Sequence, residues 1–159
     1  MKTIKLFLPP ALLMCVILCS CGNNNPVTNS TSQNIDTPFV NYIIVIPTGG
    51  SADTLYFTDR NLCRGSYSGT QNNTYCLMND TATSQSVSVT FDGNAAGSPA
   101  FTFGFLSYMG GSFTATSITG SVSLYEAVGG KIKGSFSGTF TDGAATYQCR
   151  GEFTVNRTQ

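Results

Sequence analysis

Few side chains in this 159-residue sequence could act as catalytic groups. It contains six cysteines and eight Asp and Glu residues, but it has no histidine. A cysteine nucleophile needs a base or a cation that lowers its pKa. Cys63 precedes Arg64 and Cys149 precedes Arg150, yet neighbouring side chains on a strand point to opposite faces. Because a Ser-His-Asp triad is also impossible, we expect no catalytic residue.

The carboxylates show no spacing that is typical of acid–base pairs or metal sites. None of the eight lies within three residues of another, and there is no alternating acidic array of the kind that binds calcium. Asp92 and Asp142 each precede a glycine, a pair of residues that is typical of turns. No cysteine spacing suggests zinc. The sequence therefore predicts neither a metal site nor a cofactor.

The charge balance argues against a nucleic-acid partner. Eight Lys and Arg residues balance eight acidic ones, so the formal net charge is zero. Nucleic-acid binding requires a basic surface that neutralises phosphates. We expect no nucleic acid among the partners.

The N-terminus has the layout of a secretory signal peptide. Lys2 and Lys5 precede an apolar run at 6–19 that is shorter than the roughly 20 residues needed to span a bilayer. The run leads into Leu18-Cys19-Ser20-Cys21, which resembles the lipobox of bacterial lipoproteins. That resemblance implies cleavage after Ser20 and a diacylglycerol on Cys21. Several acyl chains would then anchor the protein firmly in a membrane.

The next segment is expected to act as a tether. Residues 23–38 are rich in Asn, Ser and Thr and carry almost no charge, so they can bury little apolar surface and stay disordered. As a random coil they would reach about 20–25 Å. We therefore divide the chain into a signal peptide (1–20), a lipidated N-terminus with its tether (21–38) and a β-domain (39–159). Because the residues after Cys21 lack the aspartate typical of inner-membrane retention, the lipoprotein resemblance favours the outer membrane.

Three cysteines remain once the signal peptide is removed and Cys21 is assigned to lipid. In an exported protein this odd number predicts one disulfide and one thiol, or a bridge to another molecule. A Cys63–Cys76 bridge would close a short polar loop and contribute about 3 kcal/mol by the loop-entropy model. We favour that pairing, although Cys149 could instead pair with either of the other two.

The remainder of the chain predicts an all-β fold. Apolar and polar residues alternate in several segments, for example at 86–91 and 147–155, and Gly-containing turn signals such as Asp92-Gly93 and Asp142-Gly143 separate them. An apolar run at 41–46 suggests a central strand that is buried on both faces. Eight or nine short antiparallel strands predict a β-sandwich or a small β-barrel. The segments 134–140 and 151–155 loosely resemble the closing hairpin of small β-rich lipoproteins of unknown function.

An aromatic stretch offers the one candidate ligand site. Phe101, Phe103 and Phe105 alternate with Thr102 and Gly104, so they could line a cavity for an apolar ligand or form part of a packed core. The leading hypothesis is a non-enzymatic, lipid-anchored envelope protein with a structural, adhesive or partner-binding role. The alternatives are a carrier of a small apolar ligand and an inhibitor of a hydrolase that acts through a protruding loop at 63–76.

Overall fold

A computed structural model describes residues 41–159, which form one all-β unit. The signal peptide, the lipobox with Cys21 and the tether lie outside the described residues. Nine strands and one short 3₁₀ helix make up the unit. In chain order they are β1 (Tyr42–Pro47), β2 (Asp53–Tyr56), η2 (Arg60–Leu62), β3 (Arg64–Ser68), β4 (Asn73–Asp80), β5 (Gln85–Asp92), β6 (Phe101–Tyr108), β7 (Gly111–Tyr125), β8 (Lys131–Thr141) and β9 (Thr146–Arg157).

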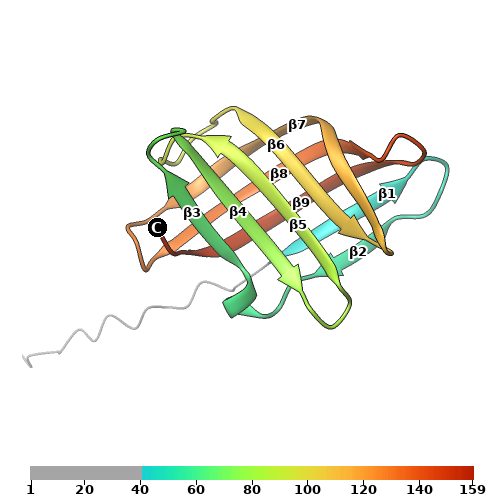
Figure 1. Cartoon of the computed structure of the whole chain (residues 1–159), viewed down its shortest axis with the longest axis horizontal. Coiled ribbons are helices and arrows are strands. Elements are labelled where there is room, and N and C mark those ends of the chain that lie inside the picture. The colour runs from blue at the N-terminus through green and yellow to red at the C-terminus, as the bar shows by residue number, and fades with distance from the viewer. Residues whose placement is uncertain (1–40) are drawn as a thin grey trace, which may run out of the picture. The chain divides into compact units, whose positions relative to one another are not determined.

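The strands belong to a single sheet that closes on itself. Their order is β2-β1-β9-β3-β4-β5-β6-β7-β8, and β8 also pairs with β9. Strand β9 completes the ring because β1 and β3 share its second edge: β1 pairs with Tyr147–Glu152, and β3 forms a short parallel pairing at Asn156 and Arg157. Every strand pairing except that of β3 with β9 is antiparallel. Figure 1 shows β3–β6 crossing in front of β1 and β7–β9. The prediction of an antiparallel all-β fold, as a sandwich or small barrel, is confirmed.

Side chains at alternate positions along the strands fill the interior of the closed sheet. The fully buried side chains come from most of the strands, and Phe57, Phe91, Phe140 and Phe153 are the largest of them. Burying one such ring contributes roughly 1.5–3 kcal/mol. Strand β1 lies between β2 and β9, as expected of an inner strand. However, only alternate residues of β1 are fully buried, and Ile44 and Ile46 are partly exposed, so the prediction of burial on both faces is wrong.

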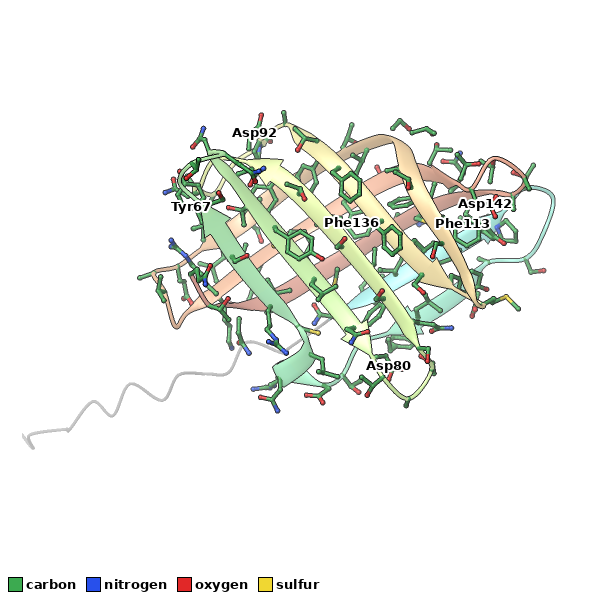
Figure 2. The ribbon with its side chains drawn as sticks, viewed as in Figure 1. Tyr67, Asp80, Asp92, Phe113, Phe136 and Asp142 are labelled. Atoms are coloured by element: carbon green, nitrogen blue, oxygen red, sulfur yellow. The ribbon has the colours of Figure 1, made fainter. Side chains whose placement is uncertain are left out.

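The turns form where Asp-Gly and Gly-Gly pairs predict them. Gly110 and Gly143 have φ angles of 79° and 94°, which L-residues with a side chain rarely adopt. Asp142 accepts hydrogen bonds from the backbone N–H groups of Ala144 and Ala145 at 2.9 and 2.7 Å. These bonds lower the pKa of the Asp142 carboxyl. Asp80, Asp92 and Asp142 all lie at strand ends (Figure 2), so the two predicted turn-forming aspartates are confirmed.

Glycines within the strands allow the sheet to curve. Gly138 shares the parity of Phe136 and Phe140, whose side chains are buried. A Cβ atom at Gly138 would overlap the carbonyl oxygen of Ser117 on β7 and lie 3.2 Å from the Cα of Ile118. Gly134 meets the carbonyl of Ser121 in the same way. Glycine is therefore required here by the close approach of a neighbouring backbone, as at the bends of a closed sheet.

A bulge in β6 reverses the predicted orientation of two phenylalanines. Phe101 pairs with Phe91, but Phe103 pairs with Thr90, so the register shifts by one residue between them. Phe101 is 8% exposed and faces inward, whereas Phe103 is 44% exposed and Phe105 is partly exposed on the outer face. Gly104 and Leu106 take the inward positions instead. Phe103 and Phe105 therefore cannot line an internal cavity, and that prediction is wrong.

The segment 63–76 is a hairpin and not a protruding loop. Strands β3 and β4 pair along their length, with Gly65 directly opposite Cys76. Cys63 precedes Gly65 by two residues, so its thiol lies diagonally across from Cys76 and not opposite it. Cys63, Cys76 and Cys149 are all buried free thiols in the structure. The predicted Cys63–Cys76 bridge is therefore absent, and so are the pairings with Cys149.

Candidate functional site

The interior of the unit offers no reactive group. Burial raises the pKa of the Cys76 thiol, and it raises that of Cys149 to about 12. Burial also raises the pKa of the Cys63 thiol, although the nearby Asn79 backbone and Asn41 side chain partly offset this effect. A buried thiol of this kind is a poor nucleophile because almost none of it is ionised. Within residues 41–159, no three His, Cys, Asp or Glu side chains are placed to hold a metal ion.

Most acidic side chains serve the turns. The Asp80 carboxylate accepts hydrogen bonds from Ala82 N and from the Thr83 hydroxyl at 2.9 and 2.7 Å, and these bonds lower its pKa. Asp59 caps the 3₁₀ helix by accepting from Asn61 N. These bonds satisfy the carboxylates within their own turns.

The outer surface of β4, β5 and β6 carries an unusual concentration of apolar side chains. Strand pairing places Tyr75, Thr90 and Phe103 in one row across the three strands. The next row consists of Leu77, Ser88 and Phe105. We call these six residues the aromatic face. It lies on the side of the sheet that faces the viewer in Figures 1 and 2.

Two hydroxyl groups form the floor of the aromatic face. Thr90 and Ser88 lie on β5 between the larger side chains of β4 and β6, and they are only 9% and 4% exposed. Neither hydroxyl makes a hydrogen bond to another described residue. Tyr75 and Phe103 are 40% and 44% exposed above them. The face thus combines exposed ring surface with unpaired hydroxyls.

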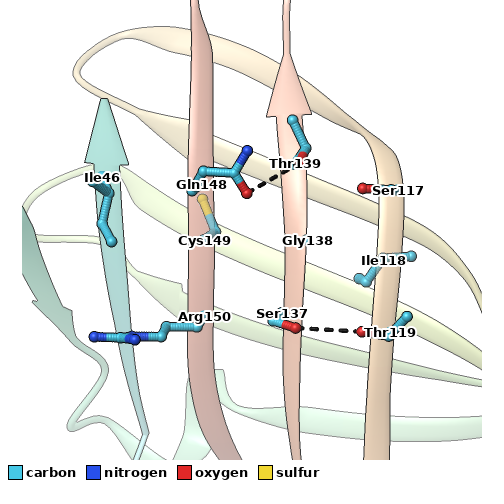
Figure 3. Close-up of a pocket in the computed structure, with 10 residues that line it drawn as sticks. All are labelled: Ile46, Ser117, Ile118, Thr119, Ser137, Gly138, Thr139, Gln148, Cys149 and Arg150. Atoms are coloured by element: carbon cyan, nitrogen blue, oxygen red, sulfur yellow. Dashed lines mark hydrogen bonds between the residues drawn. The ribbon is translucent and has the colours of Figure 1, made fainter. Parts of the chain in front are cut away.

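A second candidate surface lies on the outside of β7, β8, β9 and β1. Three shallow depressions of about 360, 190 and 400 Å³ adjoin one another there. The first and second share Arg150, and the second and third share Ser135 and Glu152. We call this surface the hydroxyl groove because Ser and Thr side chains on β7 and β8 form most of its wall. Figure 3 shows the part around Cys149 and Arg150.

The hydroxyl groove is already hydrogen-bonded along most of its length. Thr119 and Ser137 lie 3.3 Å apart, and Thr139 donates to the Gln148 side chain at 3.1 Å (Figure 3). The Tyr42 hydroxyl donates to Glu152 at 3.1 Å, a bond that raises the pKa of the Tyr42 hydroxyl. Internal bonding of this kind leaves few free partners for a ligand. We therefore regard the aromatic face as the stronger candidate.

Sequence reasoning identified only part of the aromatic face. It singled out Phe103 and Phe105 but assigned them to the interior. It missed Tyr75 and Leu77, because residues 75–78 are all apolar and show no alternation that would mark the outward positions. The structure turns these two outward by burying Thr74, Cys76 and Met78. Ser88 and Thr90 carried no signal either, because only the neighbouring strands show what surrounds them.

Comparison of the chain with protein families, with curated proteins and with solved structures finds no match. Among the residues that the structure describes, no helix has the length and apolarity to cross a membrane. The geometry of the outer faces is thus the main guide to function.

Proposed function

We propose that this protein is a lipid-anchored, non-enzymatic component of a bacterial envelope, and that its β-domain binds a partner through the aromatic face. The main support for this proposal is the pair of exposed rings, Tyr75 and Phe103, which lie in one row on the outer surface of the sheet. A contiguous apolar patch with a polar border is typical of interaction surfaces in soluble domains.

The anchoring part of the proposal depends on the N-terminal sequence. Leu18-Cys19-Ser20-Cys21 supports lipidation of Cys21 and, with it, an outer-membrane location. A tether of 16 residues (23–38) would let the β-domain meet partners about 20–25 Å from its anchor. The lipid would then lie in the membrane, while the aromatic face would contact partners at a distance from it.

The two alternative functions receive less support. A carrier needs an internal space, but the inward side chains pack into one continuous hydrophobic cluster, and the three depressions described above are open to solvent. An inhibitor was expected to act through a protruding loop at 63–76, and that segment is the β3–β4 hairpin. Partner binding through the sheet is therefore preferred to both.

Two measurements test the proposal. Metabolic labelling with an alkyne fatty acid should tag the wild-type protein and fail to tag Cys21→Ser. A photo-crosslinking amino acid at Phe103 should then capture an envelope component, whereas the same group at Tyr56, which is 67% exposed on β2, should not. Absence of label on the wild-type protein would refute the anchor. Equal capture at both positions would refute the role of the aromatic face.

A further inference from the structure

On the aromatic face, two rows of larger side chains flank β5, and we call the strip between them the slot. Tyr75 and Leu77 on β4 form one wall, and Phe103 and Phe105 on β6 form the other. Strands β4 and β6 lie two interstrand spacings apart, or about 10 Å. The two rows are separated by two residues of strand, or about 7 Å. The two exposed rings, Tyr75 and Phe103, thus lie on opposite sides of a single strand.

The floor of the slot selects for a ligand that has both apolar and hydrogen-bonding groups. Ser88 and Thr90 are more than nine-tenths buried, and their hydroxyls have no partner among the described residues. A purely apolar ligand would remove these hydroxyls from water without pairing them, which is unfavourable. A sugar ring avoids this difficulty, because its C–H groups can lie against aromatic rings while its hydroxyls hydrogen-bond to Ser and Thr.

The charges around the slot favour a neutral ligand. None of the six residues of the aromatic face is an acid or a base at neutral pH. Beyond the two rows, the outer positions carry small polar groups: Ser86 pairs with Asn79 at one end, and Asp92 pairs with Asn73 at the other. A charged polysaccharide of either sign would meet a like charge, because the exposed Arg64 on β3 lies opposite Leu77 and Asp92 lies at that end of β5. Because no bulky side chain follows on β5, a chain could extend past both rows.

We infer that the aromatic face is a binding platform for a neutral polysaccharide, with Tyr75 and Phe103 stacking against sugar rings and Ser88 and Thr90 hydrogen-bonding to their hydroxyls. This inference rests on the proposed function, since it names the chemical class of the partner.

Affinity gel electrophoresis of the mature protein tests the inference. The gels would contain mixed-linkage glucan, xylan or galactomannan as neutral polysaccharides, and polygalacturonate as an acidic one. At least one neutral polysaccharide should retard the wild-type protein. Phe103→Ser and Tyr75→Ser should each weaken that binding by roughly tenfold or more, as is typical of aromatic residues at the centre of an interface. Tyr56→Ser is the matched control and should bind like the wild type.

A second variant examines the floor of the slot. Thr90→Val keeps the shape of the side chain and removes its hydroxyl, so binding should weaken severalfold while the thermal unfolding curve stays close to that of the wild type. Tighter binding by Thr90→Val would overturn the inference in favour of plain apolar docking. The inference would also be overturned if polygalacturonate alone retarded the protein, or if none of the neutral polysaccharides did. An equal loss of binding with Tyr56→Ser would overturn it as well. If photo-crosslinking at Phe103 still captured a protein in that case, the proposed function would stand and only the glycan inference would fail.

Discussion

Replacement of Gly138 by alanine examines the close approach of β7 and β8. The added Cβ would overlap the Ser117 carbonyl oxygen and lie 3.2 and 3.3 Å from the Cα and Cβ of Ile118. Backbone atoms cannot rotate away as a flexible side chain can, so the strands must separate or the sheet must flatten. Overpacking of this kind costs about 1–3 kcal/mol. Alanine also restricts the unfolded chain more than glycine does, and this effect offsets a small part of the loss in the free energy of unfolding.

Gly69→Ala provides the matched control. Gly69 lies in the β3–β4 turn without a positive φ, and an added Cβ would meet only Tyr67 Cε1, at 3.9 Å. Urea unfolding followed by tyrosine fluorescence and circular dichroism would compare both variants with the wild type. A loss of about 2 kcal/mol should lower the urea midpoint of Gly138→Ala by about 1 M, while Gly69→Ala stays unchanged or rises slightly. Equal midpoints for Gly138→Ala and wild type would refute the argument that glycine is required by the neighbouring carbonyl.

Three further predictions concern buried polar groups. At pH 8 the folded protein should not react with a thiol reagent such as dithionitrobenzoate, because a thiol with a pKa of about 12, such as Cys149, is ionised in only about one molecule in 10⁴. After denaturation without reductant, Cys63, Cys76 and Cys149 should all react. A smaller number of reactive thiols would reveal a disulfide. Burial and the hydrogen bond from the Tyr108 hydroxyl to Asp53 at 2.9 Å raise the pKa of Tyr108 to about 12. The unfolded chain ionises at the lower pKa, so the contribution of Tyr108 to stability should be complete below pH 10 and decline as the pH rises towards 12; a Tyr108→Phe variant should lack this component of the pH dependence. Asn41→Ala should lower the free energy of unfolding by about 1–3 kcal/mol in a urea titration, because the buried Asn41 side chain accepts from Thr154 N, which would then be unpaired. An unchanged midpoint would contradict this role of Asn41.

The fold class was accessible from the sequence because its signals are local. Alternation with period two and turn pairs such as Asp142-Gly143 depend on a few adjacent residues, and both predicted the hairpins that form. The inner-strand position of 41–46 was likewise visible as an apolar run. The absence of histidine by itself excluded a Ser-His-Asp triad.

The composition of the aromatic face depends on contacts between distant strands. A one-residue shift in register reverses the face of every side chain that follows, and the bulge between Phe101 and Phe103 does this in β6. The sequence showed three alternating phenylalanines, but nothing in it marked the position of the bulge. Only the pairing of β5 with both β4 and β6 placed Thr90 between Tyr75 and Phe103.

The sequence by itself thus determined that this protein forms antiparallel strands joined by glycine turns, because backbone preference and side-chain alternation act over short range. The tertiary structure decided which rings are buried, where the sheet closes and which hydroxyls are enclosed. Those outcomes depend on long-range register, and register is set by the packing of the whole core rather than by any one segment.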